Sequence, residues 1–425
     1  MKITKVDVMQ VKTPNPSWRP ILCRVYTDEG IYGDGEAALA YGIAAPAAFG
    51  MIRDLAALII GMDPLDNEVV WDTLYKNTFW GQNGGPVVFA GISAIDFALW
   101  DIRGKFFNVP VYKLLGGKKQ DNLRCYASQL QFGWSDHWEE AKDTEEYAAN
   151  ARKAVEEGYD AIKIDFFTFD RKDGRRFDKI TETTGILKQY YVGLVEERVA
   201  AVREAVGPDV DIIMENHSVP DANGAVQLAR AVEKYNIFYF EEPNTPSPKT
   251  AKFIADHINI PISHGERVYS RWQYAQYFEN MSVQVIQPDL GNCGGITEGK
   301  KICDMAHVYD ISVQAHVCAG PLSTAAALQL ECVIPNFIIH EHHRNALLPH
   351  NRELCIYDYQ PVNGTYKVPE LPGLGNEFSE KALTCCGPGA CAVCLYRYPR
   401  SGGDYEVHRP PAGLPHRFLS ARICG

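Results

Sequence analysis

The sequence predicts an α/β barrel of the TIM type, preceded by an α+β region. Two observations predict it. After residue 120, short apolar runs alternate with helical segments, which is the pattern of βα units that build a parallel sheet. Eight such units occupy roughly 220–240 residues, close to the length of about 250 residues that is typical of these barrels. Before residue 120, strands come first and helices follow, which is an α+β pattern.

The N-terminal region opens with two stretches that read as a strand hairpin. They are MKITKVDVMQV and ILCRVYTDEGIYGDGE, with a turn signal at DEG. A helix is expected over 87–107, where Ile92, Ile95 and Leu99 recur at helical spacing. VPVYKLLGG follows and ends in a glycine turn. We therefore expect residues 1–118 to form a separate α+β domain.

Eight apolar runs are the predicted strands of the barrel. The first helix between them, EEYAANARKAVEEG, is stopped by Gly158, because glycine readily takes the left-handed conformation that ends a helix. From these runs we expect the barrel over residues 119–354 and a return segment over 355–383 that packs on the N-terminal domain. In chain order, the strands read RCYASQLQF, DAIKID, DIIMEN, IFYFEE, IPISHGE, VQVIQPD, ISVQAH and FIIHE.

Polar residues close six consecutive strands of this predicted barrel. Successive members are 26, 25, 23, 27 and 25 residues apart, one βα unit each. Because the C-terminal ends of barrel strands converge on one mouth, these six side chains would surround a single cavity. Any one of them would serve as a helix cap or a loop salt bridge, but six in register indicate a shared site. They are Glu215, Glu241, Glu266, Asp289, His316 and Glu341.

Three of these groups, Glu215, Glu241 and Glu266, are carboxylates on neighbouring strands. Adjacent acids are costly to bury together unless something neutralises them, and all-oxygen ligands of this charge suit a hard divalent cation such as magnesium. In the run FYFEEP we assign the first acid, Glu241, to the metal. Alternation along the strand turns Glu242 to the other face, where we expect a structural ion pair.

Several longer motifs carry a family resemblance. MENH, FEEP, HGER, QPDLGNCGGITEGKKI and IIHEHH, in this order and spacing, resemble the enolase superfamily, and ISAIDFALWDIRGKFFNVPVYKLLGG resembles its N-terminal capping domain. The resemblance covers residues 1 to about 380. It implies an α+β capping domain over a modified (β/α)7β barrel, one Mg²⁺ on Glu215, Glu241 and Glu266, and a carboxylate substrate. Within the superfamily the chain is most similar to acid-sugar dehydratases of the mannonate and galactonate dehydratase type.

The resemblance also implies how such a site works. Removing a proton next to a carboxylate is very unfavourable in water, and magnesium stabilises the enediolate that forms. His316 would take the C2 proton, with Asp289 orienting its imidazole. His217, two residues after Glu215 and therefore on the same face of its strand, would protonate the departing 3-hydroxyl. The product of a hexonate such as mannonate, gluconate or galactonate would be a 2-keto-3-deoxy acid.

Two further residues belong to the predicted catalytic set, Lys163 and Glu341. Lys163, in DAIKID, would add positive charge at a substrate carboxylate oxygen if its side chain faces the cavity, and otherwise it would form an ordinary surface or ion-pair contact. Asp165 stands where racemases of the superfamily keep a second lysine, and its presence disfavours a two-base racemase of the lysine–histidine type.

Other functions stay open from the sequence alone. One is another enolase-superfamily reaction, such as a racemase or epimerase of a hydroxy acid. A second is a catalytically silent binding protein on the same fold, although the intact set of predicted catalytic residues argues against it. A third is a Schiff-base aldolase with Lys163 as the nucleophile, which leaves the three carboxylates unexplained. Loss of activity on chelation of the metal would exclude the aldolase.

Two loops of the N-terminal domain combine polar and aromatic residues, NPSWRP over 15–20 and TFWGQNGGP over 78–86. Arg19, Trp80 and Asn83 are the predicted contacts to sugar hydroxyls, with ordinary surface or domain contacts as the alternative. A long insertion over 166–193 follows the second barrel strand. Insertions of this length at a barrel mouth are often lids or oligomer contacts.

The composition limits the choice of partners and compartment. The formal net charge of −11 gives no electrostatic support for binding nucleic acid. No apolar run is long enough to cross a bilayer, and the N-terminus lacks the pattern of a signal peptide. We expect a cytoplasmic homo-oligomer whose partner is a small-molecule sugar acid.

The C-terminal segment over 384–425 differs from the rest of the chain. It holds five of the twelve cysteines, five arginines and no lysine, and it is rich in proline and glycine. Cysteine spacings of five and three residues only loosely resemble a zinc site. We expect a disordered or non-native tail, such as the product of a reading-frame shift near Leu383, and no contribution from it to activity.

Overall fold

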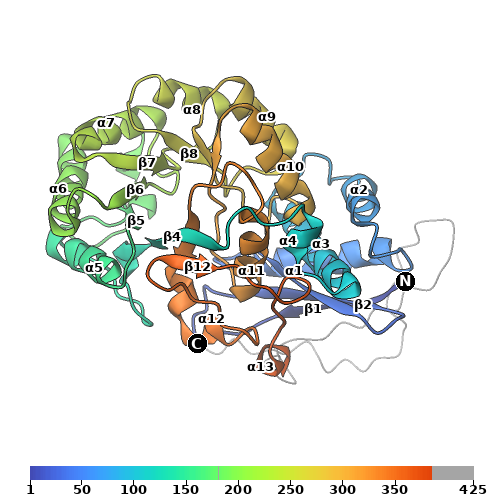
Figure 1. Cartoon of the computed structure of the whole chain (residues 1–425). Coiled ribbons are helices and arrows are strands. Elements are labelled where there is room, and N and C mark those ends of the chain that lie inside the picture. The colour runs from blue at the N-terminus through green and yellow to red at the C-terminus, as the bar shows by residue number, and fades with distance from the viewer. Residues whose placement is uncertain (180, 385–425) are drawn as a thin grey trace, which may run out of the picture. The chain divides into compact units, whose positions relative to one another are not determined.

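Figure 1 shows the chain as a computed structural model that describes residues 1–179 and 181–384. The predicted atypical tail over 384–425 lies outside these residues apart from its first member. The described chain has an N-terminal antiparallel sheet with its helices and a larger, curled parallel sheet with helices around it (Figure 1). This is the predicted α/β architecture with an α+β domain before the barrel.

The N-terminal sheet has three antiparallel strands in the order β1-β2-β3. The predicted helix over 87–107 is α3, whose middle is buried against this sheet. Gly33 and Gly35 of β3 allow a close approach, because a Cβ there would lie 2.0 Å from the carbonyl oxygen of Ala98 and 1.8 Å from that of Ala94. The elements are β1 (Ile3–Gln10), β2 (Ile21–Thr27), β3 (Tyr32–Ala37), α1 (Ala45–Ile59), α2 (Asn67–Asn77), α3 (Pro86–Phe107) and α4 (Val111–Leu114).

The barrel sheet consists, within the described residues, of eight parallel strands in the order β10-β9-β8-β7-β6-β5-β4-β11. A parallel bridge between Val313 of β10 and Phe337, shortly before β11, links the two ends of this order. The strands are β4 (Asn122–Ser128), β5 (Ala161–Asp165), β6 (Asp211–Glu215), β7 (Ile237–Glu241), β8 (Ile262–His264), β9 (Val285–Ile286), β10 (Ser312–Val313) and β11 (His340–His343).

A helix follows each of the first seven barrel strands, whereas β11 is followed by short helical turns, so the predicted (β/α)7β arrangement is confirmed. The seven helices are α5 (Thr144–Glu156), α6 (Gln189–Val206), α7 (Ala222–Val232), α8 (Pro248–Ala255), α9 (Ser270–Glu279), α10 (Gly295–Val308) and α11 (Pro321–Glu331). The turns after β11 are η5 (Arg344–Leu347) and α12 (Pro349–Arg352).

Three of the predicted strand-end residues lie beyond their strands. Glu266 follows the last residue of β8 by two positions, and Asp289 and His316 follow β9 and β10 by three positions each. One physical reason is visible before Asp289, where Pro288 lacks the N–H that would continue the ladder. These side chains therefore sit on the loops that leave the strands, at the mouth of the barrel.

The N-terminal domain is fixed to the barrel by buried hydrogen bonds. Asp96 of α3 accepts hydrogen bonds from the backbone N–H and the hydroxyl of Thr297, at 3.0 and 2.5 Å. Glu36 of β3 accepts from the backbone N–H of Gly320 at 2.6 Å, at the start of α11. These contacts hold the loops of the N-terminal domain at the barrel mouth.

The C-terminal part of the described chain returns to both regions. Its strand β12 (Thr365–Lys367) pairs antiparallel with β4, and α13 (Glu380–Thr384) ends it. The backbone N–H of Phe378 donates to Asp34 in the N-terminal sheet at 2.9 Å. The segment over 355–383 thus contacts the N-terminal domain, and the domain boundaries given above stay predictions.

None of the helices in the described ranges combines the length and the apolar character that crossing a membrane requires. The seven cysteines of this part of the chain are free thiols, and only Cys318 is more than slightly exposed. These thiols are the buried cysteines of a core, with Cys318 as the exception.

Candidate active site

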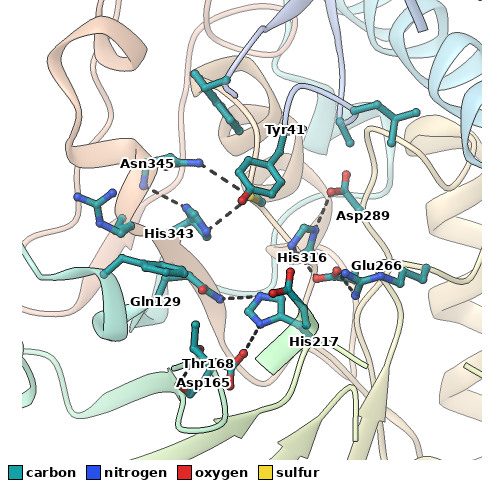
Figure 2. A pocket seen from close by; sticks show the side chains of 18 of the residues that line it. Tyr41, Gln129, Asp165, Thr168, His217, Glu266, Asp289, His316, His343 and Asn345 are labelled. Carbon is teal, nitrogen blue, oxygen red and sulfur yellow. Dashed lines mark hydrogen bonds and ion pairs between the residues drawn. The ribbon is translucent and has the colours of Figure 1, made fainter. Parts of the chain in front are cut away.

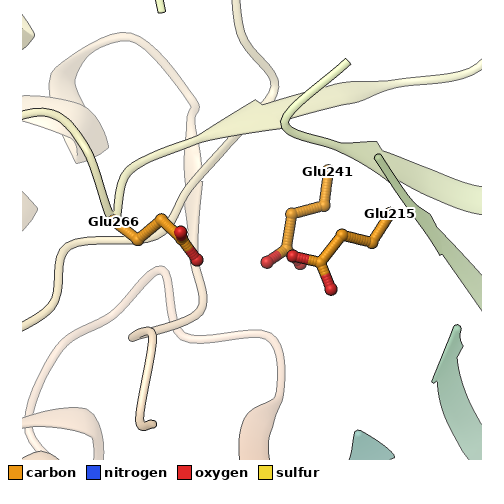
Figure 3. Close-up of side chains that lie close together, drawn as sticks. All are labelled: Glu215, Glu241 and Glu266. Atoms are coloured by element: carbon orange, nitrogen blue, oxygen red, sulfur yellow. The ribbon is translucent and has the colours of Figure 1, made fainter. Parts of the chain in front are cut away.

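Three carboxylates converge at the C-terminal end of the barrel sheet. Glu215 and Glu241 end β6 and β7 in register with each other, and Glu266 follows β8. One oxygen of each lies within 4.8 Å of the other two, and Glu266 faces the pair from the opposite side (Figure 3). Glu241 Oε2 is buried and has no hydrogen-bond partner among the described residues. An unpartnered carboxylate oxygen in an all-oxygen set fits a hard divalent cation.

The charge on these carboxylates is set by burial and by their neighbours. Burial raises the pKa of Glu241 to about 8, although the nearby Lys163 ammonium lowers it. Burial also raises the pKa of Glu215, but the positive charges of His217 and Lys163 outweigh it and hold that pKa below the usual value. The pKa values of these two adjacent carboxylates shift in opposite directions. Both would be ionised together only if a further positive charge, such as a bound cation, lay beside them.

Lys163 of β5 lies among the buried carboxylates. Its Nζ is 2.6 Å from Glu241 Oε1, 2.9 Å from Glu341 Oε1 and 3.6 Å from Glu215 Oε2, and its side chain is 1% exposed. Burial lowers the pKa of Lys163, but the charges of Glu215 and Glu241 raise it well above the usual value. A protonated amine that already contacts three carboxylates is a poor nucleophile, which argues against the aldolase alternative.

Glu341 of β11 is the fourth buried carboxylate of this cluster. It accepts hydrogen bonds from the Ser128 hydroxyl at 2.7 Å and from the backbone N–H of Val317 at 2.8 Å, in addition to the ion pair with Lys163. Burial raises its pKa, but Lys163 and His316 together hold it well below the usual value. Glu341 therefore fixes Lys163 and the chain next to His316, and its catalytic role stays a prediction.

His316 forms the first of two histidine–aspartate pairs beside the carboxylates. Its Nδ1–H donates to Asp289 Oδ2 at 2.7 Å, and its Nε2 lies 3.1 Å from Glu266 Oε2 (Figure 2). Burial lowers the pKa of His316, but the charge of Glu266 and the hydrogen bond to Asp289 raise it well above the usual value. The arrangement leaves Nε2 as the atom that can exchange a proton with a ligand in the cavity.

His217 forms the second pair, on the other side of the carboxylates. Its Nδ1–H donates to Asp165 Oδ2 at 2.6 Å, and its Nε2 lies 3.1 Å from Glu215 Oε1 and 3.5 Å from the amide nitrogen of Gln129 (Figure 2). Burial lowers the pKa of His217, but Glu215 and Asp165 raise it to about 9. Its backbone has a φ of 44°, so a left-handed turn after β6 presents the imidazole to the cavity.

The second acid of FYFEEP forms the predicted ion pair, but strand alternation does not set its direction, because Glu242 lies one residue beyond β7 with a φ of 43°. Glu242 is fully buried and forms an ion pair with Arg267, which also contacts Glu266. The Ser218 hydroxyl donates a further hydrogen bond to Glu242 at 3.1 Å. Glu242 therefore holds the guanidinium beside the three carboxylates that could bind a metal, and it is not itself part of that set.

A cavity of about 430 Å³ opens over this cluster. His217, Glu266 and His316 line it from the barrel, and Trp18 and Tyr41 line it from the N-terminal domain. The volume lies in the range of small-molecule sites, and the lining combines aromatic with ionisable side chains. The reacting groups of any ligand here would meet both histidine–aspartate pairs.

The three predicted substrate contacts do not line this cavity in the described part of the chain. Arg19 donates a hydrogen bond to the carbonyl of Gly42, and Asn83 accepts one from the Ser270 hydroxyl at 3.2 Å. Trp80 is 78% exposed. Their loops do reach the cavity, through Asn15, Trp18 and Pro86, so the role of Arg19, Trp80 and Asn83 stays a prediction.

Sequence reasoning missed two contributors to the site. The sequence indicated only that Asp165 replaces the second lysine of a racemase. In the structure its carboxylate accepts a hydrogen bond from His217. Its position two residues after Lys163 was the available signal, since alternation turns both toward the same side of the sheet. The second is the insertion after β5, which places Thr168, Arg176 and Asp178 on the cavity wall. No periodicity in the insertion pointed to these residues.

Comparison with known proteins agrees with this geometry. Residues 146–382 match the model of the enolase C-terminal domain-like family, and residues 8–116 match the N-terminal domain of the mandelate racemase / muconate lactonizing enzyme family. D-xylonate dehydratase of Haloferax volcanii is 34% identical over 377 residues, covering 88% of this chain and 86% of that protein. D-galactonate dehydratase of Pectobacterium atrosepticum is 31% identical over 392 residues, covering 90% and 94%.

A solved structure of a member of the enolase superfamily from Salmonella Typhimurium is 53% identical, with a TM-score of 0.87 and coverage of 90% of this chain and 97% of that one. The match spans both the N-terminal domain and the barrel that carries the three carboxylates. On the strength of the two family matches, the shared fold and the site geometry, this chain belongs to the enolase superfamily.

Proposed function

We propose that this protein is a magnesium-dependent dehydratase that removes the C2 proton and the 3-hydroxyl of a sugar acid to give a 2-keto-3-deoxy acid. The observation that carries the proposal is the pair of histidine–aspartate units on two sides of the carboxylate cluster. A β-elimination needs a base for the C–H bond and an acid for the leaving hydroxyl, and two separately held imidazoles can supply both. The dehydratases among its relatives support the same reaction class.

The proposed metal ligands are Glu215, Glu241 and Glu266. A divalent cation held by them would offset their charge and stabilise the negative charge that develops on the substrate carboxylate as the α-proton leaves. Lys163 keeps Glu241 oriented from within the barrel through its 2.6 Å contact. Arg267, held by Glu242, does the same for Glu266 at the cavity.

The proposed base is His316 and the proposed acid is His217. Asp289 fixes the tautomer of His316, so that Nε2 faces the cavity and can accept the C2 proton. Asp165 fixes His217 in the same way, so that its Nε2 can carry the proton that the departing 3-hydroxyl takes up. The exchanged protons then balance, since one imidazole gains the proton that the other gives up.

A screen of acid sugars tests the proposal directly. Purified protein with magnesium is incubated with hexonates, pentonates and aldarates, and 2-keto-3-deoxy products are detected by their reaction with semicarbazide. We expect turnover of at least one aldonate, and its loss on treatment with a chelator. Failure of every acid in the set to react, with magnesium bound, would favour the silent binding protein instead.

We also propose that the protein is a homo-oligomer and that it is located in the cytoplasm. Light scattering after size-exclusion chromatography would give the number of subunits. A monomer at micromolar concentration would contradict the first of these proposals.

A further inference from the structure

The insertion after β5 is anchored to the barrel by an aromatic cluster. Phe177 is fully buried, stacks on Phe167 at 4.4 Å between ring centroids, and meets Tyr191 edge-on at 5.2 Å. The backbone N–H of Phe177 donates to the carbonyl of Thr168 at 2.9 Å, which closes the turn between them. The chain therefore leaves β5, makes a surface turn and returns to the cavity at a fixed place.

The residues on either side of Phe177 face the cavity. Arg176 and Asp178 both line it, and Arg176 Nε lies 3.3 Å from Asp178 Oδ1. The Arg176 guanidinium also lies 6.0 Å from the ring centroid of Phe132, another lining residue. Burial lowers the pKa of Arg176, but Asp178 and the neighbouring Tyr41 of the N-terminal domain raise it on balance. Arg176 thus connects the insertion with the N-terminal domain across the cavity.

This group lies at the outer end of the cavity. The exposed fraction of the side chain is 1% at Glu241 and 14% at His316, and it rises to 32% at His217 and 38% at Arg176. Tyr41, which belongs to the N-terminal domain, is 55% exposed and lies apart from Asp165 and His217 in Figure 2. A ligand whose reacting end meets the two histidines would therefore direct its other end toward Arg176, Asp178 and Tyr41.

We propose that Arg176, Asp178 and Tyr41 bind the distal hydroxyls of the sugar acid, and that they select aldonates over aldarates. The proposal rests on the dehydratase function proposed above. An arginine, a carboxylate and a phenol together offer donors and acceptors, which suits hydroxyls because each hydroxyl can donate and accept. Because Arg176 is already paired with Asp178, a second carboxylate at this end would have to compete with Asp178 for that arginine and would meet its negative charge, which disfavours a diacid.

The experiment measures binding and does not depend on turnover. Calorimetry with magnesium present, in an otherwise inactive His316→Asn background, gives Kd for D-gluconate, D-galactonate and D-xylonate, for the three-carbon D-glycerate, and for the diacid D-glucarate. We expect Arg176→Ala to weaken binding of the longer aldonates at least about tenfold, the effect of one lost charged hydrogen bond. Binding of glycerate, which lacks distal hydroxyls, should change less than about twofold.

The chain offers a matched control in the preceding residue. Arg175 pairs with Asp173, is 65% exposed and does not line the cavity in the described chain, so Arg175→Ala should leave every Kd unchanged. Tyr41→Phe should weaken the longer aldonates but not glycerate, and Asp178→Asn should reduce the preference for gluconate over glucarate. Circular dichroism melting checks that each variant is folded.

Equal losses for glycerate and the longer aldonates in Arg176→Ala, or no loss at all, would overturn the proposal, as would failure of all these acids to bind. The outcome is separable from the dehydratase proposal. If the wild type binds the aldonates with the expected pattern but dehydrates none of them, the recognition proposal stands and the proposed reaction fails.

Discussion

Two groups of histidines in this protein, one partly buried and one fully buried, differ in one respect. His217 and His316, at the barrel mouth, each donate Nδ1–H to an aspartate, whereas His264 and His342, in the barrel strands, have no carboxylate partner in the described chain. Burial lowers the pKa of all four. For His264 and His342 it brings the pKa to about 3, whereas at His217 and His316 the neighbouring carboxylates reverse the direction.

The difference shows what turns a buried histidine into a candidate for proton transfer. An imidazole buried alone is held neutral and is inert near neutral pH, whereas one beside a carboxylate keeps a usable proton and a fixed tautomer. If the two histidine–aspartate pairs act as a base and an acid around one metal site, substitutions in the site should differ in their effects on metal binding, on proton exchange at C2 and on dehydration.

Removing one carboxylate between the two pairs should have the largest effect. Glu241→Gln takes away a proposed metal ligand and the nearest carboxylate partner of Lys163. We expect no magnesium binding by calorimetry and a loss of turnover of at least about a thousandfold, or about 4 kcal/mol of transition-state stabilisation. Glu279 is exposed on α9, so Glu279→Gln is the control variant and should bind magnesium and turn over substrate like the wild type. Full activity of Glu241→Gln in metal-free buffer would refute the metal assignment.

Loss of the proposed base should be nearly as severe. His316→Asn removes the Nε2 that faces the cavity, and we expect exchange of the C2 proton with solvent deuterium, followed by NMR, to fall by about 10²–10⁴-fold. The exposed His307 on α10 provides the control variant His307→Asn. Exchange at the wild-type rate in His316→Asn would mean that another residue is the base.

Loss of the proposed acid should separate the two steps. In His217→Asn we expect formation of the 2-keto-3-deoxy product to fall by about 10²–10⁴-fold while exchange at C2 continues, because the base and its aspartate are intact. Measuring both rates on one sample of the variant makes the comparison internal. Dehydration at the normal rate would remove His217 from the mechanism.

The aspartate of the second pair should matter less than its histidine. Asp165→Asn keeps the imidazole but weakens the hydrogen bond that holds it, at a cost of about 1.5–3 kcal/mol, or roughly a 10–150-fold loss of dehydration rate. Because Asp165 Oδ1 also accepts from the backbone N–H of Phe167 at 2.8 Å, the melting temperature of the variant is measured alongside. A rate equal to that of the wild type would show that His217 is positioned by other contacts.

The smallest expected effect concerns His342, a histidine without a carboxylate. Burial lowers its pKa to about 3 in the folded protein, where its Nδ1 lies 2.5 Å from the Tyr159 hydroxyl. In an unfolded chain the pKa is about 6.5. A depressed folded pKa gives stability that is present above about pH 6.5 and is lost as the pH falls toward 3.

We therefore expect acidification from pH 7.5 to 5.5 to destabilise the wild type by about 1 kcal/mol more than His342→Gln, because glutamine does not titrate. The melting temperature of each protein is measured at both pH values, and the fall on acidification is compared between the two proteins. The loss of the Tyr159 contact in the variant then cancels, because it is present at both pH values. An identical fall in both proteins would show that His342 does not stay neutral on folding.

The barrel and most of the reactive end of the site could be predicted from the sequence pattern alone. The alternation of apolar runs with helices fixed eight strands, and equal spacing placed Glu215, Glu241 and Glu266 on one rim. The Asp289–His316 pair followed from the same argument, because the ends of neighbouring parallel strands are adjacent whatever the loops do. The alternation of side chains along a strand and the spacing between successive strands are regular, so both can be recognised in the sequence.

The side chains of irregular segments that reach the cavity could not be predicted in this way, because long-range packing selects them. The structure brings Asp165 to His217 and returns Arg176 from the insertion to the cavity, whereas Arg19, Trp80 and Asn83 do not line that cavity in the described chain. Loops have no repeating geometry, so the direction of each side chain depends on long-range packing such as the burial of Phe177. Strand spacing therefore predicted the carboxylates and the base of the site. The residues proposed to bind the distal part of the substrate depend on how two distant loops pack together.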